Sequence, residues 1–365
     1  MRTATSLRLL LIPAALLAAA CEESSSPLEP PATPPRQDSP QVVAEARWAD
    51  GYLRVTDPLS TGYSPAANFS FNRAGGAITI TRPVGTTGRY IATFGGLSAL
   101  LAGRSAVHVT GYGTGNTYCK PVTSYLASDK VEVRCFKGGN GTPVNANFTL
   151  LVTGAMGDRG FAYAHQPAAT GYAPDAQGSW NPAGTMKVIR FRKGEYEVVF
   201  TNLRPSELLL GHAQVTAVGS GQARCTLAEW GGEPDLYVQV SCHTPGGALV
   251  DSKFGVLFAR PADHLAYAFA DQPTGASYTP PAFGAWNPTG GGISVGRSGV
   301  GKYSVRWIGA DPRILGRGNV QVTAVEFGTG THCKVTGQGA ESAEVRCYRP
   351  NGTLVDSQYS LMLGS

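Results

Sequence analysis

Five short sequence patterns each occur three times in the chain, at intervals of about 105 residues. In order along each copy they are GYSP, GYAP and SYTP; GRYIATF, GEYEVVF and GKYSVRW; VHVTGYG, AQVTAVG and VQVTAVE; VEVRCF, VQVSCH and AEVRCY; and NFTLLV, KFGVLF and QYSLML. A period of this length is that of an independent domain, not of a solenoid repeat. The sequence therefore predicts three copies of one module, over residues 47–154, 155–260 and 261–365.

Each pattern alternates apolar with polar or small residues, which is the signature of a β-strand. In the first GRYIATF copy, Tyr90, Ala92 and Phe94 share one face. A strand with one apolar face belongs to an antiparallel sheet that packs on one side and faces water on the other. No segment has apolar residues that recur with the helical period of about 3.6 residues over the length of a helix. About seven such strands per module predict an all-β chain of three tandem antiparallel β-sandwich modules, with small closed barrels as the alternative.

Six cysteines fall in the same two places of each module, as the pairs Cys119/Cys135, Cys225/Cys242 and Cys333/Cys347. On the later strand Cys135 keeps phase with Val131 and Val133, so its sulfur is expected to face inward. In an exported protein one even pair per module indicates a disulfide. Six free buried thiols are the alternative, and zinc is disfavoured because the spacings are not CxxC and no histidine accompanies the pairs.

The N-terminus has the features of a targeting segment. Arg2 and Arg8 precede the apolar run LLLIPAALLAAA, which ends at Cys21 and predicts a signal peptide over residues 1–20. The ending LAAAC resembles a bacterial lipobox, although Ala18 stands where leucine is commoner. The resemblance implies that Cys21 becomes a lipid-carrying mature N-terminus. An ordinary secreted protein is the alternative.

Residues 21–46 are rich in proline, serine and glutamate and have no apolar period, so we expect an extended tether. Glu22, not aspartate, follows Cys21. By resemblance to enteric lipoproteins this implies the outer membrane or the cell surface and not the inner membrane. The short links GAMGDRG and RPADH between modules predict a moderately stiff linear array.

Two kinds of aromatic residue are candidate ligand contacts. Trp180 and Trp286 stand in SWNPAGT and AWNPTGG, and Phe71 takes their place in the first copy. Either they form a sugar-stacking surface, or they fill the core beside an asparagine that supports a turn. The other candidates are the tyrosines of the Tyr-x-Pro patterns and two aromatic residues between the paired cysteines: Tyr63, Tyr172, Tyr278, Tyr125 and Trp230. Asp251 and Asp356 align with Asn145, which indicates a turn cap and not a catalytic acid.

Catalytic motifs and metal-ligand spacings are absent from the sequence. The six histidines fall at unmatched module positions, which favours substitution at the surface. The formal net charge of +5 is scattered, with no basic stripe for nucleic acid. We therefore expect no enzyme, cofactor or metal site. A hydrolase with a site assembled from distant residues is the remaining enzymatic alternative.

The modules resemble the tandem repeat units of uncharacterised secreted or lipid-anchored bacterial proteins, over nearly all of the chain from Trp48 onward. The resemblance rests on Tyr-x-Val-x-Phe, Val-Gln-Val-Thr-Ala and Val-Arg-Cys-Phe/Tyr, and it implies no activity. We expect a lipid-anchored protein of the bacterial cell envelope, with a binding or structural role and an unidentified protein or glycan partner. Carbohydrate binding through exposed tryptophan and tyrosine is the alternative.

Overall fold

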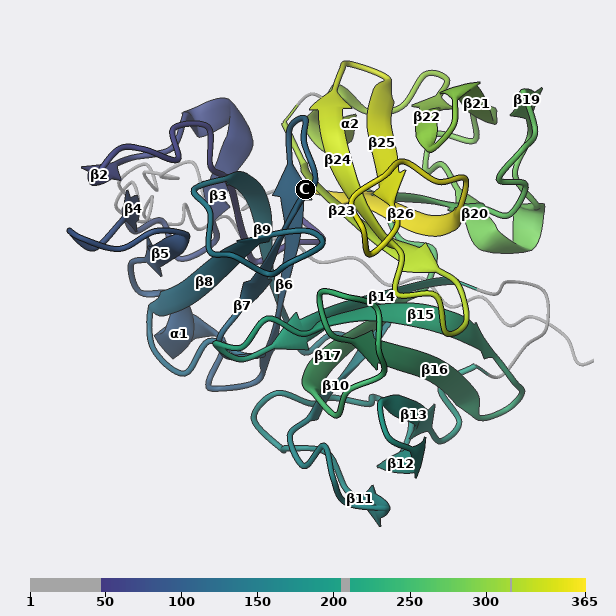
Figure 1. Ribbon diagram of the computed structural model, residues 1–365, viewed down its shortest axis with the longest axis horizontal. Coiled ribbons are helices and arrows are strands. Elements are labelled where there is room, and N and C mark those ends of the chain that lie inside the picture. Colours follow the sequence, from purple (N-terminus) through teal and green to yellow (C-terminus); the bar gives the residue numbers. More distant parts are fainter. Residues whose placement is uncertain (1–46, 205–210, 316) are drawn as a thin grey trace, which may run out of the picture. The chain divides into compact units, whose positions relative to one another are not determined.

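The structure is a computed structural model that describes residues 47–204, 211–315 and 317–365 (Figure 1). The expected signal peptide (1–20), the tether (21–46) and the lipid-carrying Cys21 lie outside the described residues. Helix is confined to two four-residue segments, α1 (Leu97–Leu100) and α2 (Pro312–Leu315), and to two short 3-10 turns, η1 (Ala67–Phe69) and η2 (Ala282–Gly284). No helix in the described ranges has the length and apolar character needed to cross a membrane.

The predicted all-β class is confirmed, and strands recur in the same order in each module. Module 1 contains β1 (Gly51–Arg54), β2 (Gly62–Tyr63), β3 (Ser70–Asn72), β4 (Ile78–Thr81), β5 (Arg89–Phe94), β6 (Ser105–Tyr112), β7 (Thr117–Pro121), β8 (Lys130–Lys137) and β9 (Asn147–Gly154). Module 2 contains β10 (Arg159–Ala164), β11 (Gly171–Tyr172), β12 (Met186–Arg192), β13 (Glu195–Phe200), β14 (His212–Val218), β15 (Arg224–Gly231), β16 (Leu236–His243) and β17 (Lys253–Ala259). Module 3 contains β18 (Leu265–Ala270), β19 (Ser277–Tyr278), β20 (Ala285–Trp286), β21 (Ile293–Gly299), β22 (Lys302–Trp307), β23 (Asn319–Val325), β24 (His332–Gln338), β25 (Ser342–Tyr348) and β26 (Gln358–Gly364).

Each module is a sandwich of two open sheets, so the barrel alternative is wrong. The three-strand sheets run β1-β9-β6, β10-β17-β14 and β18-β26-β23, with β3 and β20 added at the edges of β1 and β18. The five-strand sheets run β2-β4-β5-β8-β7, β11-β12-β13-β16-β15 and β19-β21-β22-β25-β24. Tyr90, Ala92 and Phe94 of β5 are fully buried between the two sheets of module 1, as their alternation predicts.

The predicted disulfides are present, one within each five-strand sheet. Cys119 and Cys135 are directly opposite each other on the antiparallel strands β7 and β8, and their Cα atoms are 4.1 Å apart. Cys225–Cys242 and Cys333–Cys347 occupy the same register in modules 2 and 3. Each bond therefore fastens two neighbouring strands whose sulfur atoms face the module core.

The modules do not form the expected linear array. Strand β24 of module 3 pairs in parallel with β6 of module 1, and β15 of module 2 pairs in parallel with β23 of module 3. Three equivalent backbone hydrogen bonds link the copies: Gly219 N to Pro121 O (3.0 Å), Glu326 N to Leu227 O (2.8 Å) and Gly113 N to Val335 O (2.9 Å). At two joints the five-strand sheet of one module thus continues into the three-strand sheet of another, from β15 to β23 and from β24 to β6. Between modules 1 and 2, β7 and β14 remain in separate sheets and the Gly219–Pro121 hydrogen bond links them.

A tyrosine and an aspartate or asparagine tie the turns of every module. In module 2, Asp251 Oδ1 accepts from Gly194 N at 2.8 Å and lies 2.9 Å from the Tyr196 hydroxyl. Asp356 makes the same contacts with Gly301 and Tyr303, and Asn145 with Gly88 and Tyr90. The hydrogen bonds to Arg190, followed by those from Gly194 and Tyr196, outweigh burial and lower the pKa of Asp251 to about 2. The side chain acts as a turn cap.

Replacing Cys225 and Cys242 together by alanine is expected to lower the free energy of unfolding by about 3 kcal/mol, because the chain between them is no longer closed into a loop in the unfolded state. Urea denaturation measures this difference. The Cys119→Ala/Cys135→Ala variant is the matched comparison, since the sequence separations are 17 and 16. An unchanged urea midpoint in both variants would contradict the expectation.

Asp251→Ala is expected to cost about 1–3 kcal/mol of stability at pH 7, because the Gly194 amide and the Arg190 guanidinium lose their acceptor. Asp251→Asn, the residue type that module 1 carries at Asn145, should cost less. The depressed pKa of Asp251 stabilises the fold above pH 3.8, and this contribution is lost as the pH falls toward 2. Urea denaturation at pH 7 and pH 3 tests both points; equal costs for alanine and asparagine would refute the cap assignment.

Candidate functional site

Strands β6, β14 and β23 are buried on both faces, unlike a strand with one face in water. One face of each packs inside its own module through apolar residues such as Val107, Val215 and Val322. The other face meets the neighbouring modules and carries His108, Gln214 and Gln321, which are all fully buried. The expectation that each strand has one packed face and one face in water is therefore wrong for β6, β14 and β23. The three modules pack against one another along these strands.

Side-chain hydrogen bonds between modules satisfy much of this buried polar face. Thr110 Oγ1 of module 1 donates to Gln321 Oε1 of module 3 at 2.8 Å. Asn319 Nδ2 donates to the Leu150 carbonyl at 3.1 Å. Between modules 2 and 3, His212 Nδ1 lies 2.8 Å from Ser360 Oγ. We call the region where the three modules meet along these strands the junction.

Four of the six histidines are buried, so the expectation of surface positions is wrong for His108, His212, His243 and His332. Burial lowers the pKa of His108 and His212 to about 3, so both imidazoles are neutral at physiological pH. The Ser360–His212 contact resembles part of a hydrolytic dyad. At neutral pH, however, His212 is far from the pKa of an efficient general base, and both side chains are closed off from solvent.

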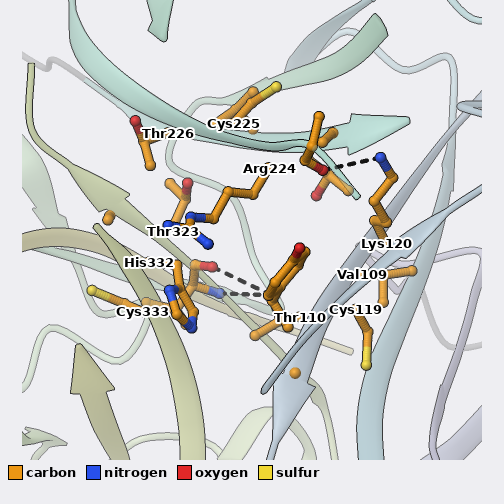
Figure 2. A pocket seen from close by; sticks show the side chains of 18 residues that line it. Val109, Thr110, Cys119, Lys120, Arg224, Cys225, Thr226, Thr323, His332 and Cys333 are labelled. Atoms are coloured by element: carbon orange, nitrogen blue, oxygen red, sulfur yellow. Dashed lines mark hydrogen bonds between the residues drawn. The ribbon is translucent and has the colours of Figure 1, made fainter. Parts of the chain in front are cut away.

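A cavity of about 60 Å³ lies at one end of the junction (Figure 2). Its lining comes from equivalent positions of all three modules: Val109, Val215 and Val322; Thr110, Thr216 and Thr323; Cys119, Cys225 and Cys333. The repeat breaks at two places. Where module 1 has Tyr118, module 2 has Arg224 and module 3 has His332; where module 1 has Lys120, module 2 has Thr226. Most residues that line the cavity are thus repeated from module to module, whereas its charged side chains are not.

Arg224 extends from β15 toward Thr323 and His332 (Figure 2). Its Nε donates to the Gly330 carbonyl at 2.8 Å and its Nη2 to the Pro245 carbonyl at 3.2 Å, while Nη1 has no hydrogen-bond partner among the described residues. The guanidinium is only 4% exposed, and burial lowers its pKa. Arginine nevertheless stays charged in proteins.

Lys120 also lines the cavity, but its ammonium is turned away from the Arg224 guanidinium and donates to the Ala223 carbonyl at 3.0 Å (Figure 2). Lys334, two residues after His332 on β24, bridges modules 3 and 1 in the same manner, through the Gly115 carbonyl and the Thr117 hydroxyl. Burial lowers the pKa of each lysine to about 7. Both ammonium groups are partly deprotonated at neutral pH, because no carboxylate compensates the loss of hydration.

His332 packs between Tyr348, at 5.5 Å between ring centroids, and Tyr118, at 5.7 Å. Neither ring nitrogen has a hydrogen-bond partner in the described part of the chain. Burial, and then the nearby Arg224 and Lys334, lower the pKa of His332 well below 6.5. The ring is neutral and offers one N–H donor. No aspartate or glutamate belongs to the described lining, so the site is rich in donors and poor in acceptors.

The tryptophans of the WNP motif lie in a shared apolar cluster where the modules meet. Trp180 and Trp286 pack with Phe71 against this cluster and are partly buried. Their indole N–H groups donate to the carbonyls of Met156 (2.8 Å) and Ala262 (3.0 Å). Each neighbouring asparagine spans its turn with a side-chain amide that donates to two carbonyls and accepts from the amide two residues on: Asn72, Asn181 and Asn287.

The remaining aromatic candidates lie apart from the cavity. The hydroxyls of Tyr63, Tyr172 and Tyr278 each accept from a backbone amide of their own module. Trp230 is 4% exposed and lies edge-on to Phe269 of module 3, with 5.0 Å between ring centroids. Tyr125 lies 6.2 Å from Tyr163 of module 2. The last two residues therefore help to join neighbouring modules.

Within the described ranges, no three His, Cys, Asp or Glu side chains come together as metal ligands would. No protein-family model matches the chain, and neither does any curated protein or solved structure.

Lys120, Arg224 and His332 were not candidates on sequence grounds. Arg224 and His332 each stand immediately before a cysteine whose side chain faces the core, so alternation places them on the opposite face. In an isolated sandwich that face is in water, and a charged residue there is unremarkable. Only the closure of the three modules turns it into an interior.

In buffer free of phosphate and sulfate, the stability of the protein is expected to rise between pH 7 and pH 9. The folded pKa of about 7 for Lys120 and Lys334 lies below the unfolded value of 10.5, so the unfolded state binds more protons in this window. Lys120→Met should raise stability at pH 7 by about 1–3 kcal/mol and flatten this rise.

Urea denaturation at half-unit pH intervals provides the measurement, and Lys302→Met, at an exposed position, is the matched control. The titration stops at pH 9 because tyrosines with raised pKa values, such as Tyr118 at about 12, destabilise the fold at higher pH. A stability that is level or falling from pH 7 to pH 9 would contradict the expectation.

Proposed function

We propose that the chain is an exported protein of the bacterial cell envelope, held to a membrane by lipid on Cys21, and that its folded part has a binding or structural role and not a catalytic one. The observation that carries the proposal is the set of three disulfides, one in each module. Such bonds form and persist in oxidising compartments outside the cytoplasm. The apolar run that ends at Cys21 supplies a matching route of export.

The junction supports a non-catalytic role. Catalytic acids and bases act best when their pKa lies near the working pH and a substrate can reach them. His108 and His212 are instead neutral over the physiological range and sealed from solvent. The three disulfide-bonded modules pack against one another at the junction, and we expect this folded part to be a rigid body in the envelope.

Lipid attachment is testable by expressing the full chain in a bacterium grown with radiolabelled palmitate. The wild-type protein should carry the label and fractionate with membranes, whereas Cys21→Ser should lose both properties. Glu22→Gln is the matched control, because it changes the neighbouring residue and leaves the cysteine. Unlabelled wild-type protein in the soluble fraction would refute the lipid anchor and leave secretion as the route.

A further inference from the structure

The junction cavity encloses a positive charge that the described protein does not neutralise. Arg224 is almost fully buried, and its three nitrogens meet two backbone carbonyls and no carboxylate. Burying a charge is costly unless a counter-charge and hydrogen bonds accompany it. The two carbonyls supply hydrogen bonds but no charge, and Nη1 is left with neither. A negative ion at Nη1 would satisfy both needs.

The size of the cavity limits what that ion can be. A water molecule needs about 10–15 Å³ of such space, so about 60 Å³ corresponds to roughly four water positions. A tetrahedral oxyanion has five heavy atoms and fits this size. A monosaccharide or a nucleotide does not.

The polar groups around the cavity match an oxyanion in kind. Arg224 offers Nη1, and neutral His332, which lies beside the guanidinium in Figure 2, has one free N–H. A guanidinium forms short, charge-assisted hydrogen bonds to phosphate or sulfate oxygens. A metal cation would find no carboxylate ligand among these described side chains.

We propose that the junction cavity binds one tetrahedral inorganic oxyanion, phosphate or sulfate, held by Arg224 and His332. Module 2 supplies the arginine and module 3 the histidine, while module 1 contributes Thr110 and Tyr118 to the lining. The site forms only where the modules meet, and it occurs once per chain. Bound anion thus adds an ionic link between modules 2 and 3, independently of how the protein is anchored.

Equilibrium dialysis of the wild-type protein with labelled phosphate and with labelled sulfate at pH 7 tests the proposal. The expected result is saturable binding of one anion per chain. Arg224→Gln should weaken binding at least about tenfold, the effect of losing a charged hydrogen bond. His332→Phe, which keeps an aromatic ring and removes the N–H, serves as a second variant should Arg224→Gln fail to fold, and Lys302→Gln is the exposed control that should bind as the wild type does.

Thermal denaturation separates site binding from general salt effects. Phosphate and sulfate stabilise many proteins by exclusion from the surface, without saturation and equally in every variant. A saturable rise in Tm is expected in the wild type, absent in Arg224→Gln and weakened in His332→Phe. A rise of equal size and shape in all variants, or dialysis without saturation, would overturn the proposal.

Glycerol 3-phosphate defines the ligand further. It should bind at least about tenfold more weakly than inorganic phosphate, since its carbon chain exceeds the cavity. Equal binding would overturn the assignment to a free inorganic ion.

Discussion

The fold depends on the burial of three polar strand faces against one another. One face of each of these strands, β6, β14 and β23, packs in the core of its own module. The other face carries amide, hydroxyl and imidazole groups. In a single module this second face would be hydrated. In the assembled protein some of these groups find partners in neighbouring copies, as in the Thr110–Gln321 and Asn319–Leu150 hydrogen bonds, whereas the ring nitrogens of His108 have none among the described residues. Buried polar groups cost stability unless they are paired, so closure of the modules and pairing of these groups depend on each other.

The joints between modules use the same chemistry as the sheets themselves. Backbone hydrogen bonds link one module to another at three places: Gly219–Pro121, Glu326–Leu227 and Gly113–Val335. The buried lysines Lys120 and Lys334 also bridge two of these joints by donating to atoms of the adjoining copy, although burial of each ammonium costs stability at neutral pH. The third joint has Thr226 in the corresponding place, beside the guanidinium of Arg224. Differences between the copies are thus concentrated where they meet, and the shared residues build the sandwiches.

Local features of this structure follow from sequence, and long-range features do not. Alternation and the cysteine pairs predict the strands, the core residues Tyr90, Ala92 and Phe94, and all three disulfides. The alignment of Asp251 with Asn145 predicts a turn cap, which the contacts to Gly194 and Tyr196 confirm. The junction could not be predicted, because polar residues that alternate with valine have the same pattern whether they meet water or another module. The sequence therefore predicts a surface position for His332, which is nearly inaccessible in the structure, and gives no sign that Arg224 is buried as well.

Closure also fixes how many copies the protein can contain. In a linear solenoid an added repeat extends the stack and leaves its ends unchanged. Here each module is already joined to both of the others by backbone hydrogen bonds, and module 3 leads back to module 1. A fourth copy could enter only by parting one joint and exposing a polar face on either side of the gap. A chain with two copies would present one unpaired sheet edge and one bare junction face, which a second chain could complete. Three is therefore the number of modules that closes the set of joints. A chain with a different number of modules would leave a junction face open, and another chain could cover it.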